Sequence, residues 1–438
     1  MPVASDDFEF VRSTGLIDEL VSEQLLVAEA RVDPGVLNGQ GKGASLVLEH
    51  PRLAFVSYPY EWSFAALKAA ALFHLDLQLR ALGKGVALTD ASAYNVQFNG
   101  AKPIFIDSLS FRRYREGEFW YGHRQFCEQF VNPLLLRSLL GVPHNAWYRG
   151  SLEGISAQEL SRILPWHTRL SWNTLTNVFV QARLQQAASS TDRALETSKT
   201  RQLPKIGFEQ MLRGLRRWIS RMQPKADSRS EWQDYAQDNS YSDEEDAKKR
   251  QCVTQFTQGY RPQLLFDLGC NTGDYSALAL TSGADRVIGF DFDHGALDRA
   301  FERARREALN FLPLHLDAVN PSPEQGWQQA ERQGLSRRAK GDAVLALALV
   351  HHLAISRNVP LDGVLDWITA MAPRGIIEFV PKADPMVQQL LLLRQDLFDD
   401  YTRENFEALL AARGRIVDSH SVSSSGRTLY IYDRSEQD

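Results

Sequence analysis

Two stretches of the sequence carry residues whose types and spacing could do chemistry. In the first, Asp90 is followed by Asn95 and then by Asp107, which ends an apolar run. An Asp, an Asn and a second Asp in this order can hold Mg²⁺ and the phosphates of a nucleotide. In the second, "FDLGCNTGDYS" follows a buried apolar run, with Gly269 and Gly273 inside it. Glycines at such a turn let the backbone approach a ligand closely, and the N–H groups of a following helix attract an anionic group.

The residues around the two glycines indicate which ligand the second stretch favours. A dinucleotide requires G-x-G-x-x-G, so that the backbone can lie against the pyrophosphate. This chain has Asn271 at the middle position and Asp274 directly after Gly273. An Asp that faces a pyrophosphate would repel it. The pattern D-x-G-x-N-x-G therefore favours a ligand without phosphates.

The elements that must position the second stretch alternate between strand and helix from about residue 262. Such alternation implies right-handed βαβ crossovers and a parallel sheet. The end of the chain, "RIVDSHSVSSSGRTLYIYDR", is two β runs joined through a Ser/Gly-rich turn. We expect these runs to close the sheet as an antiparallel hairpin. The sequence thus predicts an α/β fold with a mostly parallel sheet.

This half of the chain, roughly residues 230–438, resembles the class I S-adenosylmethionine-dependent methyltransferases. D-x-G-x-N-x-G is similar to their motif I, in which Asn at the middle position is a familiar variant. Asp291 ends the second predicted strand, where the family's carboxylate accepts the ribose hydroxyls, and Asp317 ends the third, where the family holds the adenine amino group. The resemblance implies a Rossmann-like sheet and S-adenosylmethionine as the cofactor. The cofactor-binding residues that it implies are Asp267, Gly269, Asn271, Gly273, Asp291 and Asp317, with Tyr241 as a candidate in the segment that closes over the cofactor.

His351 and His352 follow the fourth predicted strand, on what the resemblance makes the substrate side of the pocket. Methyl transfer is an in-line displacement, so most of the rate can come from positioning two reactants. A base is needed only when the acceptor is a hydroxyl or a protonated amine, and His is the best base near neutral pH. We therefore predict His351 and His352 as the catalytic candidates. The alternative is that they pack or hydrogen-bond locally.

Residues 53–130 resemble the core of the protein-kinase-like fold. The resemblance includes "LAFVSYPYEW" as a strand and hinge, a long helix over 63–82, and Asp107 in place of the Asp of the DFG motif. It implies Asp90 as a catalytic base, with Asn95 and Asp107 as metal ligands. However, Leu-Thr replaces the His-Arg before Asp90, and no strand lysine of the V-A-I-K type is visible. We therefore expect a degenerate, non-catalytic domain. Asx-turn chemistry in a tight loop is the alternative explanation of Asp90 and Asn95.

The composition defines three segments and excludes several classes of protein. We expect a kinase-like domain over 1–185, a polar linker with cofactor-capping helices over 186–245, and a methyltransferase domain over 246–438.

A net charge of −5 gives no reason to expect nucleic-acid binding, so a small molecule or glycan is favoured as the acceptor. The three cysteines have no metal-binding or disulfide spacing. No apolar run reaches ~18 residues and no secretory signal is visible, so we expect no membrane span, no metal and a cytoplasmic location.

The sequence thus predicts a bacterial two-domain enzyme that transfers a methyl group from S-adenosylmethionine to an unidentified acceptor. The whole chain is loosely similar to rhizobial host-specificity nodulation proteins. Two other classes stay open. One is a bifunctional enzyme whose N-terminal half is an ATP-dependent phosphotransferase, and the other is a non-enzymatic scaffold with a vestigial cofactor site.

Overall fold

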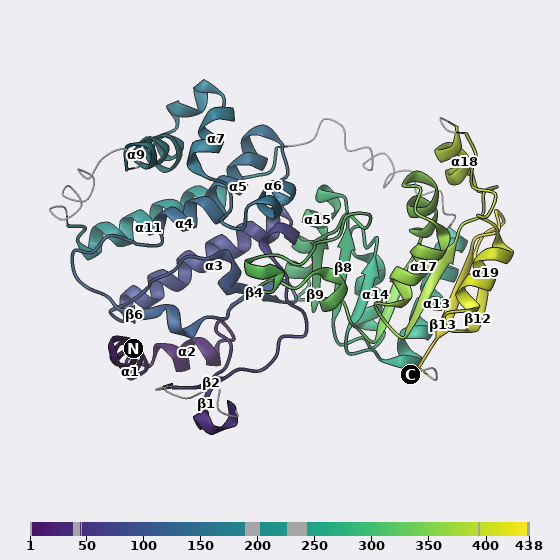
Figure 1. Ribbon diagram of the computed structural model, residues 1–438, viewed down its shortest axis with the longest axis horizontal. Coiled ribbons are helices and arrows are strands. Elements are labelled where there is room, and N and C mark those ends of the chain that lie inside the picture. The colour runs from purple at the N-terminus through teal and green to yellow at the C-terminus, as the bar shows by residue number, and fades with distance from the viewer. Residues whose placement is uncertain are drawn as a thin grey trace. The chain divides into compact units, whose positions relative to one another are not determined.

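Seven strands form one mixed sheet in the computed structural model, which describes residues 2–37, 44, 46–188, 202–225, 243–392 and 395–435 (Figure 1). The chain divides into two compact units: Met1–Phe98 with Lys102–Asp227, and Asn99–Ala101 with Ser228–Asp438. The sheet belongs to the second unit, and its strands run in the order β12-β13-β11-β10-β7-β8-β9.

Strands β7 to β11 of this sheet are parallel to one another, whereas β13 is antiparallel to both β11 and β12. The predicted α/β class, the parallel core and the antiparallel hairpin at the end of the chain are confirmed. The strands are β7 (Leu265–Leu268), β8 (Val287–Asp291), β9 (Phe311–His315), β10 (Ala343–Ala346), β11 (Arg374–Phe379), β12 (Arg415–Ser421) and β13 (Thr428–Asp433).

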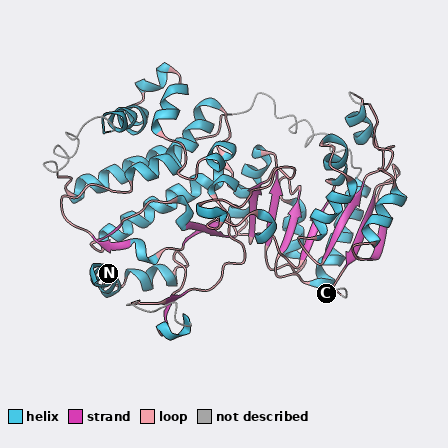
Figure 2. Ribbon diagram, in the orientation of Figure 1, coloured by secondary structure: helices cyan, strands magenta, loops and turns pink. Residues whose placement is uncertain are grey.

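Helices follow the strands of the sheet in the alternating order that the sequence predicts (Figure 2). β7 and β10 are buried along their whole lengths, as expected for parallel strands covered on both faces. In α15, the residues Leu297, Phe301 and Ala304 are buried at helical spacing. The helices of this unit are α13 (Asp243–Tyr260), α14 (Asp274–Thr281), α15 (His294–Arg306), α16 (Leu335–Arg338), α17 (Leu361–Thr369), α18 (Pro385–Leu391) and α19 (Arg403–Ala411).

The first unit is built around α3 (Phe64–Gly83), the long helix that the sequence predicts. Ser63 caps this helix by accepting a hydrogen bond from the backbone N–H of Ala66 at 3.2 Å. Helix α11 (Lys205–Arg221) packs on α3 through a buried apolar face that includes Leu212 and Ile219. An ion pair between Arg216 and Asp76 joins the two helices. The polar segment predicted over 186–245 thus contains one helix that belongs to this unit.

Short strands accompany the helices of the first unit. β3 (Val86–Leu88) pairs antiparallel with β6 (Phe111–Arg113), so the stretch from Asp90 to Asp107 lies between two paired strands. The other strands are β1 (Ala30–Arg31), β2 (Leu48–Glu49), β4 (Val96–Asn99) and β5 (Lys102–Phe105). The other helices are α1 (Pro2–Ser13), α2 (Leu16–Ser22), α4 (His123–Phe126), α5 (Asn132–Leu135), α6 (Asn145–Gly150), α7 (Ala157–Ile163), α8 (Trp172–Thr174) and α9 (Gln181–Ala188).

Candidate functional site

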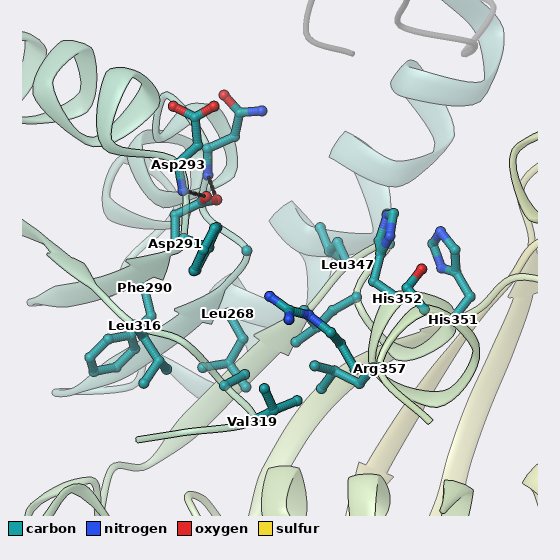
Figure 3. A pocket seen from close by; sticks show the side chains of 18 of the residues that line it. Leu268, Phe290, Asp291, Asp293, Leu316, Val319, Leu347, His351, His352 and Arg357 are labelled. Carbon is teal, nitrogen blue, oxygen red and sulfur yellow. Dashed lines mark hydrogen bonds between the residues drawn. The ribbon is translucent and has the colours of Figure 1, made fainter. Parts of the chain in front are cut away.

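A cavity of about 350 Å³ lies at the carboxyl ends of the parallel strands of the second unit (Figure 3). This edge of a parallel α/β sheet is where ligands bind in such folds. Residues at the ends of β7, β8 and β9 line one part of the cavity. Residues of the loop after β10, of helices α17 and α18, and Arg427 before β13 also line it. The lining includes Gly269, Asn271, Asp291, Phe292, Asp293, Asp317, Leu347, His351, His352, Arg357, Trp367, Met386, Leu390 and Arg427.

The turn after β7 leaves room for a ligand at Gly269. This residue has φ 80°, and a Cβ built on it would make only ordinary contacts, the nearest 3.8 Å from the carbonyl oxygen of Leu347, so its backbone is not crowded. Asn271 also has a positive φ, 46°, which Asn tolerates better than most residues. Gly273 serves a different purpose, because a Cβ there would lie 2.4 Å from the Phe311 ring. Gly269 and Asn271 therefore line the cavity, whereas Gly273 allows α14 to begin close to β9.

The Asp291 carboxylate at the end of β8 is held by the backbone. One oxygen accepts the N–H of Asn271 and the other accepts the N–H of Asp293, each at 2.8 Å (Figure 3). Burial raises the pKa of Asp291, and the backbone hydrogen bonds oppose that rise. Each carboxylate oxygen can accept a further hydrogen bond. The group is therefore a fixed acceptor at the wall of the cavity.

The two other predicted carboxylates lie in different surroundings. Asp317 lines the cavity and accepts the N–H of Val319 at 3.3 Å. Asp267 is not among the lining residues. It is buried within β7 and accepts a hydrogen bond of 2.6 Å from the Ser276 hydroxyl, so it joins β7 to α14. Burial raises the pKa of Asp267 to about 7. The structure thus places Asp267 behind the turn rather than in the cavity.

His351 and His352 both line the cavity, with ring centroids 4.1 Å apart. Burial lowers the pKa of His352 to about 4. The pKa of His351 falls well below its usual value, first because of burial and then because of nearby positive charge on His352, Arg427 and Lys249. Both rings are therefore neutral near pH 7. His351 Nδ1 is buried and has no hydrogen-bond partner among the described residues.

Two buried ion pairs near the histidines were not predicted from the sequence. Lys249 of α13 lies 2.7 Å from the Oε1 of Glu378 on β11. Arg427 donates two hydrogen bonds, of 2.6 and 2.8 Å, to Asp384. The partners of the first pair are 129 residues apart, and nothing local in the sequence connects them. Tyr241, the predicted cofactor-closing residue, lies outside the described residues.

In the first unit, the structure brings Asn95 and Asp107 together. Asn95 Nδ2 donates to Asp107 Oδ2 at 3.2 Å. Asp90 accepts the N–H of Ser92, and Asp107 accepts the N–H of Leu109, so both carboxylates form Asx turns. Burial raises the pKa of Asp107, and the charge of Asp90 contributes to that rise. A nucleotide or metal site here, and a kinase-like fold for this unit, stay predictions.

Across the described ranges, no group of three or more His, Cys, Asp and Glu residues could hold a metal ion.

Comparison with known proteins gives one relative that spans nearly the whole chain. The chain is 48% identical over 429 residues to the nodulation protein NoeA of Rhizobium meliloti (strain 1021). The matched region covers 98% of this chain and 90% of that protein. No protein-family model matches the sequence. In the part of the chain that the structure describes, no helix is both long enough and apolar enough to cross a membrane.

Solved structures similar to this chain each cover less than half of it. The PH0226 protein from Pyrococcus horikoshii OT3 is 16% identical with a TM-score of 0.32, and covers 43% of this chain and 90% of that one. The N-methyltransferase NodS from Bradyrhizobium japonicum WM9 is 12% identical with a TM-score of 0.32, and covers 45% and 98%. The methyltransferase domain of bacterial CtHen1-C is 16% identical with a TM-score of 0.31, and covers 43% and 98%.

Proposed function

Since the chain belongs to the family of the nodulation protein NoeA, we propose that it acts as an S-adenosylmethionine-dependent methyltransferase through the cavity of its second unit. The observation that carries this proposal is the arrangement at one edge of the sheet. Gly269, the anchored Asp291 carboxylate and Asp317 line the same cavity. These are three of the positions at which motif I and the following strand ends of class I methyltransferases hold their cofactor.

The charges on this side of the cavity suit S-adenosylmethionine better than a dinucleotide. Asp291, Asp293 and Asp317 line the wall, and a pyrophosphate beside them would be repelled. Asp274, at the start of α14, is held by an ion pair of 2.6 Å with Arg303. A nucleoside with free ribose hydroxyls can instead donate to these carboxylates, and a sulfonium cation is compatible with them. Gly269 and Asn271 would hold the cofactor at the turn, and Asp291 would accept from its ribose.

Bound S-adenosylmethionine would supply an electrophilic methyl group, and the chain must then position an acceptor. His351 is suited to this role because the residue lines the cavity and its buried Nδ1 has no hydrogen-bond partner among the described residues. Its lowered pKa makes it a weak base, so its role is to hydrogen-bond the acceptor group and orient it. Asp267 supports the turn because the hydrogen bond that it accepts from Ser276 joins β7 to α14.

The surroundings of His351 favour an acceptor hydroxyl over an ammonium group. Arg357 and Arg427 line the same part of the cavity, and the pKa of His351 is lowered by the charges of Arg427 and Lys249. Arg427 and Lys249 are paired with acidic partners. Arg357 forms no ion pair with the described residues, so it would repel a protonated amine but not a neutral hydroxyl. We therefore propose a hydroxyl of a small molecule or glycan as the methyl acceptor.

Label transfer tests this function directly. The full chain is incubated with methyl-labelled S-adenosylmethionine and the small-molecule and glycan fractions of a rhizobial lysate. We expect label in a hydroxyl-bearing compound, and loss of most of the transfer in His351→Ala. The matched control is His420→Ala, because His420 lies on β12 outside the cavity. Label in no fraction contradicts methyl transfer, and equal transfer by His351→Ala contradicts the role of this histidine.

A further inference from the structure

Two tryptophans in the first unit are turned toward solvent within a short segment. Residues 163–172, called here the tryptophan segment, join α7 to α8 and include a short 3-10 helix, Trp166–Leu170. The side chains of Trp166, Leu170 and Trp172 are 75%, 80% and 73% exposed. Tryptophan is highly buried on average in folded proteins, so two such residues this close together require an explanation.

The segment is anchored by other residues, so its exposed side chains do not result from a lack of core contacts. Leu164 and Thr168 are buried between the exposed positions. Ser171 accepts the N–H of Thr174 at the start of α8, and the Arg169 guanidinium lies 4.7 Å from the centre of the buried Phe179 ring. The backbone therefore holds Trp166 and Trp172 outward while its remaining side chains hold it to the unit.

The charged residues within the segment and after it as far as α9 are basic, and the exposed Glu159 of α7 lies just before the segment. Between Glu159 and Asp192 the sequence contains no acidic residue, whereas Arg162, Arg169 and Arg183 are exposed. None of these three arginines forms an ion pair with any residue that the structure describes. The exposed apolar side chains thus lie among cations that have no anionic partner in this part of the chain.

We propose that the tryptophan segment docks the protein onto an anionic lipid surface. Tryptophan rings are favoured at the boundary between headgroups and acyl chains, because one end of the ring is apolar and the other is polar. Arginines beside them attract anionic headgroups, and combining the two signals strengthens surface binding. A segment this short is small beside the ~800 Å² that each partner contributes to a standard protein interface, which favours a lipid surface over a protein partner.

Vesicle binding by the full chain tests the proposal. The chain is sedimented with vesicles of phosphatidylcholine alone and of phosphatidylcholine with phosphatidylglycerol, while tryptophan emission is recorded. We expect binding to the anionic vesicles with a blue shift of the emission, and weaker binding at high salt. Trp166→Ser combined with Trp172→Ser should weaken this binding by at least about tenfold. Arg162→Gln combined with Arg169→Gln should reduce the preference for anionic vesicles.

The matched control is Trp327→Ser, which removes a tryptophan that is 76% exposed in the second unit. Its binding should equal that of the unchanged chain. Because all three tryptophans are exposed, thermal unfolding should be the same in each variant. The proposal is overturned if the unchanged chain does not sediment with anionic vesicles, or if the double tryptophan variant binds as well as the control. A dimer in solution that this double variant converts to a monomer would also overturn it, because a second copy of the chain would then be the occupant.

Discussion

The ammonium nitrogen of Lys249 lies 2.7 Å from the Oε1 of Glu378, and both side chains are almost completely buried. The other oxygen of Glu378 accepts the backbone N–H of Ala348 at 2.9 Å. Ala348 has φ 50°, a conformation that residues other than glycine rarely adopt. The ion pair therefore fixes the turn that leads from β10 to His351, and it joins that turn to α13.

Lys249→Met should destabilise the protein strongly, because it leaves the Glu378 carboxylate buried without its cation. We expect a loss of about 3–5 kcal/mol in the free energy of unfolding of the second unit, measured by urea denaturation. The control is Lys248→Met, which breaks the exposed pair between Lys248 and Glu244 on the same helix and should change nothing measurable. Equal stability of the two variants would show that the buried pair is not needed.

Acid should destabilise the first unit through His74. This side chain is fully buried among aromatic rings, neither ring nitrogen has a hydrogen-bond partner among the described residues, and burial lowers its pKa to about 3. Because the folded pKa lies below the ordinary value of 6.5, the unfolded chain takes up a proton that the folded chain refuses. The contribution of His74 to stability is therefore complete above pH 6.5 and is lost as the pH falls toward 3.

His74→Phe tests this pH dependence, since phenylalanine fits an aromatic environment and does not titrate. Between pH 7 and pH 5, the unchanged chain should lose about 2 kcal/mol more unfolding free energy than the variant. Urea denaturation of the full chain at the two pH values, followed by tryptophan fluorescence, measures the difference. Equal losses in both proteins would contradict the assignment to His74.

Asp291→Asn should weaken binding of S-adenosylhomocysteine by about ten- to a hundredfold. The substitution removes the charge and one acceptor oxygen, so either the Asn271 or the Asp293 N–H loses its acceptor. Isothermal calorimetry measures the affinity. Asp285→Asn is the control, because Asp285 is exposed and lies outside the cavity, and it should bind as the unchanged chain does. Unchanged affinity in Asp291→Asn would exclude this carboxylate from the binding site.

The sequence alone predicts the positions that depend on where strands end. Gly269, Asp291 and Asp317 come directly after apolar runs, and parallel strands bring their carboxyl ends to one edge, so their shared cavity follows from the pattern. The Asx turn of Asp90 depends only on neighbouring residues and was the expected alternative, whereas the similar turn of Asp107 was not predicted.

Features that depend on side-chain direction or on distant contacts could not be predicted in this way. The motif does not indicate that Asp267 points toward Ser276 rather than into the cavity. Lys249 and Glu378 meet across 129 residues, and the low pKa of His351 results from burial and from charges on separate elements. These contacts form only when the sheet is assembled.

The most direct measurement of the central claim is calorimetric titration of S-adenosylmethionine into the full chain and into Gly269→Asp. A side chain at 269 would project from a turn that lines the cavity and would add a charge near Asp291. The control is Gly283→Asp, which also places a side chain at a positive φ, 117° against 80°, but lies outside the cavity. We predict one binding site in the unchanged chain and in the control, and none in Gly269→Asp. Absence of binding to the unchanged chain, or unchanged affinity in Gly269→Asp, would contradict the account.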